Sequence, residues 1–210
     1  MARMVAGRSD AVASLAEVFR EHGYEGASLA LIGKATGLGK GKGKGKGKGK
    51  GSLYHFFPNG KEEMVQAVLV EIEQWFEGSV YSPLRHGDDA DAAITAMLDK
   101  TAKYFRSGRR VCLVGALAVT NTRDLFAQAI RGYFVAWVEA LQAALVRQGR
   151  DAERARVLSE DAILSFQEAI VLSRALDDPA VFQRAIDQLH SRLTADRKTL
   201  DDNASGSGSL

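Results

Sequence analysis

SLALIGKATGLGKGKGKGKGKGKGSLYHFFPNGKEEM, residues 28–64, carries two stretches typical of helices on either side of a glycine-lysine repeat. Ser28 is a favoured helix N-cap, and Leu31, Ile32 and Ala35 follow at helical spacing before Gly37 ends the pattern. Beyond the repeat, Pro58 breaks the chain. Asn59 and Glu62 then have the spacing of a capping box at the start of the next helix.

The repeat itself, residues 39–51, alternates glycine and lysine without exception. Each glycine costs a helix about 1 kcal/mol relative to alanine, and the lysines repel one another. We therefore expect disorder, or at least no sustained helix, from Lys40 to Lys48. A disordered basic arm of this kind can still neutralise phosphate groups without sequence preference.

The spacing of the repeat excludes the two common nucleotide-binding loops. A phosphate-binding P-loop needs Ser or Thr after Gly-Lys, whereas every Gly-Lys pair here is followed by glycine. The dinucleotide fingerprint needs a glycine five residues after the first, where this repeat always has lysine. The repeat also dominates the net charge of +2: without five Gly-Lys units, 23 basic residues would face 26 acidic ones.

Apolar residues recur at helical spacing through most of the remaining chain, and no alternating strand pattern competes with them. We expect an all-α fold. Its helices include one around Val12–Phe19, one from Met64 to Phe76, and others at about 90–106, 109–118, 122–148, 153–175 and 179–195. Asp178 and Pro179 mark the start of the last helix as N-cap and first-turn proline. The final residues, ASGSGSL, read as a flexible tail.

When ten residues of the repeat are left out, this region resembles the DNA-binding end of the TetR family of bacterial repressors. In that family a helix with an I-A-x-x-A-G-V-like pattern precedes a tight turn and a short recognition helix with K-G-x-L-Y-x-x-F. The matching residues are Ile32, Ala35, Gly37, Leu38, Lys50, Gly51, Leu53, Tyr54, Phe57 and Lys61. The segments RRVCLVGALAV and RALDDPAVFQRA further resemble the flavonoid-responsive subgroup known in bacilli.

The resemblance implies a repressor with a helix-turn-helix DNA-binding domain at residues 1–65, a helical effector-binding and dimerisation domain at 66–196, and a tail at 197–210. Its partners would be double-stranded operator DNA, a second copy of the chain and a small apolar or aromatic effector; no cofactor is implied. The implied DNA-binding residues are Ser28, Lys50, Gly51, Ser52, Tyr54, His55 and Lys61.

The effector is expected in the aromatic-rich region from Trp75 to Phe166, in a mostly apolar cavity with few polar anchors. We expect most of the candidate residues to be ordinary core and a few to line the cavity; they are Trp75, Tyr104, Phe105, Cys112, Phe126, Tyr133, Phe134, Trp137 and Phe166. The dimer contact is expected on the last two long helices. Its candidates, with intramolecular core as the alternative, are Ala162, Phe166, Ile170, Phe182, Ile186 and Leu189.

The repeat is the main departure from the family. Leu53 lies sixteen residues after Gly37, where about six are usual, so the repeat interrupts the junction before the recognition helix. A rival hypothesis is therefore a helical effector-binding or structural dimer whose DNA-binding head is disabled. The repeat also fits an error that copied one Gly-Lys unit several times, which an intact-mass measurement would reveal.

Other functions have little support in the residues. The four histidines, 22, 55, 86 and 190, lack metal-ligand spacing, and the acidic residues Asp88, Asp89 and Asp91 do not form a calcium-loop pattern. Cys112, the only cysteine, has no histidine near it in sequence. The longest apolar run has nine residues, and the N-terminus lacks a signal-peptide pattern. We expect a cytoplasmic protein that is neither an enzyme nor membrane-bound.

Overall fold

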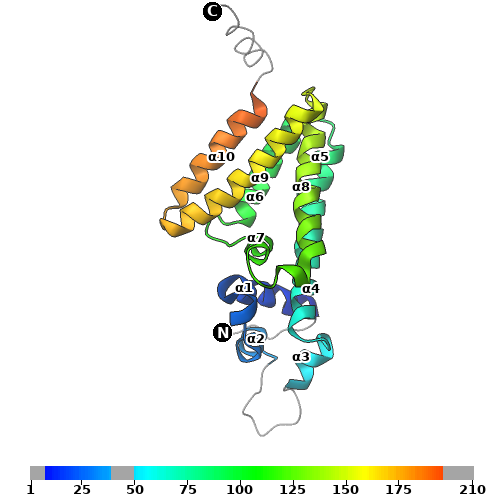
Figure 1. Ribbon diagram of the computed structural model, residues 1–210, viewed down its shortest axis with the longest axis vertical. Helices are drawn as coiled ribbons and strands as arrows, with labels where there is room; N and C mark the ends of the chain where they lie inside the picture. Colours follow the sequence, from blue (N-terminus) through cyan, green and yellow to red (C-terminus); the bar gives the residue numbers. More distant parts are fainter. Residues whose placement is uncertain (1–7, 39–49, 196–210) are drawn as a thin grey trace, which may run out of the picture. The chain divides into compact units, whose positions relative to one another are not determined.

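The computed structural model describes residues 8–38 and 50–195, with side chains in the second range from Leu53 onward. Every regular element in these ranges is helical, which confirms the expected all-α fold class (Figure 1). The predicted disorder of Lys40–Lys48 and the predicted tail at 197–210 lie outside the described residues.

The described chain forms two compact units. One comprises the residues up to Phe76 together with Val111–Phe134, and the other comprises Glu77–Arg110 together with the residues from Val135 onward. We call them unit 1 and unit 2. Their limits are set by packing and differ from the functional boundary at residue 65 that the sequence suggests, which stays a prediction.

Unit 1 is built on the helix α1 (Arg8–Gly26), which packs against α2 (Leu29–Thr36) and α4 (Lys61–Phe76). It also contains α3 (Lys50–Phe56), α7 (Leu113–Ala118), the 3₁₀ turn η2 (Arg123–Phe126) and the beginning of α8 (Ala127–Arg147). Residues three and four apart on α1 bury one stripe against the other helices, as the periodicity predicts. This core includes Val12, Leu15, Phe19, Ile32, Leu53, Phe57, Met64, Val65 and Val68.

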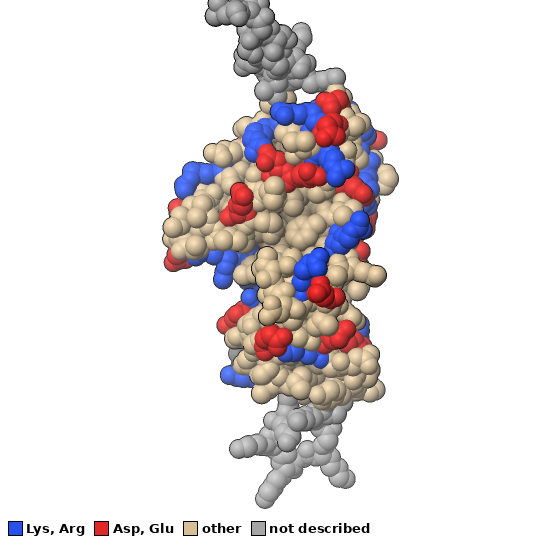
Figure 2. Space-filling view, viewed as in Figure 1, with Lys and Arg blue, Asp and Glu red and all other residues tan. Residues whose placement is uncertain are grey.

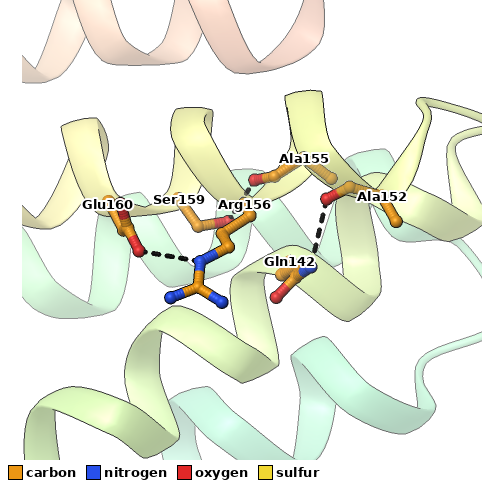
Figure 3. Close-up of polar contacts among 6 residues, drawn as sticks. All are labelled: Gln142, Ala152, Ala155, Arg156, Ser159 and Glu160. Carbon is orange, nitrogen blue, oxygen red and sulfur yellow. Dashed lines mark hydrogen bonds and ion pairs between the residues drawn. The ribbon is translucent and has the colours of Figure 1, made fainter.

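Unit 2 contains the π-helical turn η1 (Glu77–Tyr81), α5 (Ser82–His86), α6 (Ala90–Tyr104), the rest of α8, α9 (Ala152–Ala175) and α10 (Pro179–Thr194). The helices α9 and α10 form an antiparallel pair, and α10 also packs on α6 (Figure 1). The side-chain amide of Gln142 on α8 donates a hydrogen bond of 3.1 Å to the carbonyl oxygen of Ala152, which joins α8 to the first residue of α9 (Figure 3).

Several helix ends follow the sequence signals. Ser28 caps α2 by accepting a hydrogen bond from the amide of Leu31 at 3.2 Å, and Asp178 caps α10 by accepting one from Ala180 at 2.9 Å. The capping partner of Asn59 differs from expectation: its amide donates to a carboxylate oxygen of Glu63 at 2.9 Å, so Glu63 has the role predicted for Glu62. Because α4 begins at Lys61, Glu63 is the third residue of the helix, and its side chain can reach back to the amide of Asn59.

Two predicted helix boundaries were wrong. The helix expected at 109–118 begins at Leu113, because Arg106, Ser107 and Gly108 have φ angles of 52°, 51° and 83° and form a left-handed turn after α6. The helix expected at 122–148 is divided into η2 and α8. The short elements between residues 77 and 86 were not expected at all, since five-residue helices leave little periodicity to detect.

The segment Arg123–Arg147 is long and apolar enough to cross a membrane by length and composition alone. However, Trp137, Ala140, Leu141, Ala144 and Leu145 within it are all fully buried by the protein. A helix whose apolar residues are buried against the rest of the protein is typical of a protein core.

Candidate nucleic-acid interface and ligand pocket

The first part of the candidate DNA-binding head is α2. Gly37, the residue directly after α2, has φ 70° and ψ 4°, the left-handed conformation that the sequence predicts for the turn glycine. The hydroxyl of Thr36 donates to the carbonyl oxygen of Ile32 at 2.8 Å and accepts from the amide of Leu38 at 3.3 Å. These bonds satisfy polar groups at the end of α2 and define the direction in which the chain leaves it.

The second part is α3, which presents two different faces. Leu53 within α3 and Phe57, the first residue after the helix, are 4% and 0% exposed and anchor this segment in the core of unit 1. Tyr54, at 42%, and His55 are exposed on the other side. The structure therefore leaves two of the predicted DNA-binding side chains free to meet a ligand from solution. Lys50, Gly51 and Ser52 lie in the first turn of α3, where the side chains are outside the description.

Arg8, at the start of α1, holds the end of α3 in place. Its guanidinium lies 5.1 Å from the ring centre of Phe57, and its Nε donates to the carbonyl oxygen of Phe56 at 3.5 Å. A carboxylate oxygen of Glu63 on α4 lies 3.8 Å from the same guanidinium. The sequence analysis missed this residue, because nothing in the local pattern pairs position 8 with a helix 48 residues away.

Lys61, another predicted DNA-binding residue, is held by Tyr24 near the end of α1. Its ammonium donates to the main-chain oxygen of Tyr24 at 2.8 Å and lies 4.3 Å from the centre of the Tyr24 ring. Burial, helped by the nearby Glu62 and Glu25, raises the pKa of Tyr24, so the phenol stays neutral at physiological pH. The Tyr24 ring also contacts Phe126 of η2, and the two ring centres lie 5.7 Å apart.

Unit 1 also contains a pocket of about 560 Å³ lined by α4, α7, η2 and the start of α8. Phe126 and Tyr133, 3% and 4% exposed, form its aromatic wall, and aliphatic residues including Leu69 and Val114 extend it. Its polar residues are Gln66, Glu73, Asp124 and Gln128. The pocket thus has the size and the mainly apolar lining of a small-molecule site.

The nine predicted effector-binding residues are divided between the two units. Phe126 and Tyr133 line the pocket. Trp75 and Phe134 are close in sequence to lining residues of the pocket, are not part of its lining, and are partly exposed. Cys112 caps α7 by accepting a hydrogen bond from the amide of Gly115 at 3.3 Å. In unit 2, Tyr104 stacks with Arg110 at 4.7 Å. Phe105, Trp137 and Phe166 are fully buried there, and Trp137 donates a hydrogen bond to the sulfur of Met97 at 3.4 Å.

The residues predicted for the dimer contact need a correction. All six, Ala162, Phe166, Ile170, Phe182, Ile186 and Leu189, are at most 6% exposed within a single chain. They form the core that α9 and α10 share with their neighbours, which was the alternative explanation. The apolar residues of α9 that remain exposed are instead Val157, Leu164, Val171 and Leu172, with Leu176 directly after the helix.

No group of three or more His, Cys, Asp or Glu side chains that could hold a metal ion occurs among the described residues. Asp89, one of the three clustered acids, accepts a hydrogen bond from Ala92 at the start of α6, and Asp91 lies within that helix. Two of the three acids are therefore part of the N-terminus of α6.

Comparison with known proteins agrees with this architecture. Residues 90–188 match the family model of the "Transcriptional regulator LmrA/YxaF-like, C-terminal domain", a TetR-type domain. No curated protein resembles the chain closely enough in sequence to count as a relative.

Several solved structures share the fold at low sequence identity. A TetR transcriptional regulator from Legionella pneumophila is 18% identical, with a TM-score of 0.75 over 90% of this chain and 98% of that one. A TetR regulator from Chloroflexus aurantiacus is 22% identical, with a TM-score of 0.68 over 90% and 94%. The fatty acid degradation regulator FadR from Bacillus halodurans is 18% identical, with a TM-score of 0.65 over 91% and 100%.

Residues 90–188 are thus similar to the C-terminal domain of TetR-type transcriptional regulators, and the chain shares the all-α fold of solved TetR regulators.

Proposed function

We propose that the chain is a repressor that binds operator DNA as a homodimer through α2 and α3 and is released by a small effector. The observation that carries the proposal is the two-faced helix α3, on which Tyr54 and His55 are exposed while Leu53 is buried. A short helix anchored from beneath can enter the major groove and present its outer side chains to base edges.

The neighbouring residues would contact the phosphate backbone. Ser28 stands at the N-terminus of α2, where main-chain amides attract anions. Lys61 has three N–H donors, so it can hold the Tyr24 oxygen and still donate to a phosphate. We also assign Lys50, Gly51 and Ser52, in the first turn of α3, to the DNA contact.

The dimer would form through the outer face of α9 beside α10. Val157, Leu164 and Val171 are spaced seven residues apart and so follow one stripe, and Leu172 borders it. Leu172, Val181 and Ala185 line a groove between the two helices. Figure 2 shows uncharged surface, interrupted by single charged side chains, over α9 and α10 on the face in view. Exposed valine and leucine side chains that gather on adjacent helices favour a protein partner.

The effector would bind in the pocket of unit 1, and its influence would pass through aromatic contacts to the DNA-binding head. Phe126 lines the pocket and touches Tyr24, and Tyr24 holds Lys61 at the start of α4. A ligand that moves Phe126 therefore also disturbs the contact between Tyr24 and Lys61. Lys61 lies four residues after Phe57, the residue that follows α3. Such a ligand favours whichever conformation it binds better, which is the condition for releasing DNA.

A second candidate function is a helical effector-binding dimer that no longer reads DNA. The sixteen-residue separation of Gly37 and Leu53 favours it, because extra residues between two helices loosen their relative geometry. In either case we propose a cytoplasmic protein that is not an enzyme. We also propose that the repeat is an insertion and, from the C-terminal segments, that the chain falls in the flavonoid-responsive subgroup.

The test is selection of bound duplexes from a random pool, followed by titrations at several salt concentrations. We expect an enriched near-palindromic site for a variant lacking residues 40–49, and weaker discrimination with stronger salt dependence for the full chain. Tyr54→Ala should lower discrimination in the deletion variant. Val146→Ala, an equally exposed position on α8, is the matched control. Equal discrimination with and without the ten residues would contradict damage by the repeat, and absence of any enriched site would favour the second candidate.

A further inference from the structure

A second, smaller pocket lies within unit 2, where the chain turns from α9 into α10 (Figure 1). Its volume is about 290 Å³. Two segments supply most of its lining, the turn that follows α6 and the junction of α9 with α10. The turn contributes Ser107, Gly108 and Arg109, and the junction contributes Ser173, Arg174 and Asp177.

Strained backbone is concentrated around this pocket. Among the described residues, the only ones other than glycine with a positive φ are Arg106, Ser107 and Asp177, at 52°, 51° and 49°. Ser107 and Asp177 line the pocket, and Arg106 directly precedes Ser107. A left-handed conformation is unfavourable for a residue with a side chain, and proteins retain such residues mostly at sites that bind or switch. Three of them around one pocket therefore call for a functional explanation.

The pocket also has hydrogen-bond donors that the described chain leaves unused. The guanidinium groups of Arg109 and Arg174 are exposed and form no ion pair with a described residue. Nη1 of Arg174 donates to the main-chain oxygen of Arg109 at 2.7 Å, which orients this guanidinium and leaves its other N–H groups available. Gly108 is buried, and its amide donates to no acceptor in the described part of the chain. Because buried amides are nearly always paired, an acceptor from solution is expected there.

The charges of the lining favour an anion. Two guanidinium groups outnumber the one carboxylate, which belongs to Asp177. This carboxylate forms no ion pair within the described residues either, although two arginines line the same pocket. Arginine binds oxyanions through paired, charge-assisted hydrogen bonds. An unpaired carboxylate beside them can accept a hydrogen bond from an anion that still has a proton to donate.

We propose that this pocket binds hydrogen phosphate. Two of its oxygens would accept hydrogen bonds from Arg109 and Arg174, and a third would accept one from the amide of Gly108. Its hydroxyl would donate to Asp177. Sulfate has the same shape but no proton at neutral pH, so it would meet only repulsion from Asp177. A phosphate monoester at about pH 8 has also lost its last proton and should be disfavoured for the same reason.

The site does not depend on the proposed function, so the experiment uses the full chain without DNA. It is titrated with inorganic phosphate, sulfate and glycerol phosphate at about pH 8 and constant ionic strength. Calorimetry gives the affinities. The amide signal of Gly108 in a nitrogen–proton NMR spectrum reports on the pocket itself, which matters because the lysines of the repeat also attract anions. We expect phosphate to shift this signal and to bind at least about fivefold more tightly than the other two anions, the effect of one unit charge at close range in water.

Three variants test the assigned side chains. Arg109→Gln should weaken phosphate binding by about fivefold. Arg154→Gln is the matched control, because it removes the same charge from an exposed position near the start of α9 and should leave binding unchanged. Asp177→Asn should bind sulfate about fivefold more tightly, since the repulsion is lost and asparagine tolerates the left-handed backbone. Melting temperatures without ligand establish that each variant folds.

Three results would overturn the inference: a Gly108 signal that phosphate does not shift, equal affinity of the unchanged chain for phosphate and sulfate, or unchanged phosphate affinity in the Arg109→Gln/Arg174→Gln double variant. The duplex selection described above is independent of all three. A chain that selects an operator but fails these tests is a regulator without this site, whereas a chain that binds phosphate but selects no DNA keeps the site and loses the proposed function.

Discussion

The ammonium of Lys61 is bound twice by one residue: it donates to the main-chain oxygen of Tyr24 at 2.8 Å and lies 4.3 Å from the centre of the Tyr24 ring. The two residues are 37 positions apart, near the end of α1 and at the first position of α4. Since α3 ends at Phe56, this contact secures the chain immediately beyond the exposed face of that helix.

Removing the Tyr24 ring should weaken unit 1. We expect Tyr24→Ala to lower the free energy of unfolding by about 1–2 kcal/mol, because it removes a cation–π contact with Lys61 and an edge contact with Phe126. Tyr24→Phe keeps the ring and the main-chain oxygen, so its effect should stay within about 0.5 kcal/mol. Urea denaturation measures both values. Equal losses in the two variants would mean that the hydroxyl, rather than the ring, matters.

Lys61 offers a test of phosphate contact that is separate from stability. In the variant lacking residues 40–49, Lys61→Gln should reduce the slope of log affinity against log salt by about 1, because one phosphate contact is lost. The control is Lys103→Gln, which changes an exposed lysine on α6 in unit 2 and should leave the slope unaltered. An unchanged slope for Lys61→Gln would limit its role to anchoring α4.

Two glycines should respond to alanine in opposite directions. Gly108 has φ 83°, and a Cβ there would lie 2.3 Å from the hydroxyl oxygen of Ser173 and 2.9 Å from the Cβ of Phe182. Left-handed strain and overpacking together should cost Gly108→Ala about 2–4 kcal/mol. Gly132 lies within α8 with no atom near its missing Cβ, so Gly132→Ala should gain about 0.5–1 kcal/mol. Thermal and urea unfolding of both variants give the comparison, and a neutral Gly108→Ala would refute the close packing.

The proposed dimer contact predicts that one charge on α9 separates the protomers. Leu172 is 50% exposed and lines the groove between α9 and α10, so Leu172→Glu should raise the dimer dissociation constant about tenfold or more without unfolding the chain. Val146→Glu changes a 43% exposed position on α8 and should leave the dimer intact. Sedimentation equilibrium measures the constant. A dimer equally stable in both variants would place the contact elsewhere.

The helices that were predicted correctly are those whose signals are local. Ser28 caps α2 through an amide three residues away, and Gly37 takes a left-handed conformation that few other residues tolerate. Asp178 and Pro179 likewise begin α10 with groups within two residues of each other. Each of these interactions is complete within one turn of backbone, so the order of the amino acids is enough to predict it.

The parts that sequence patterns could not supply depend on residues far apart in the chain. Periodicity identified the apolar faces of α9 and α10 but not whether a neighbouring helix or a second chain covers them; Phe166 and Phe182 proved to be buried within one chain. The turn at Arg106–Gly108 is held against Ser173, 65 residues away, and so replaced the start of a predicted helix. The pocket of unit 1 likewise arose only when packing placed Glu73 of α4 and Asp124 of η2 around one space. Helical periodicity predicts which face of a helix is apolar. Which residues cover that face, and which ligand or partner can contact the exposed face, is determined only by the packing of helices that are distant in sequence.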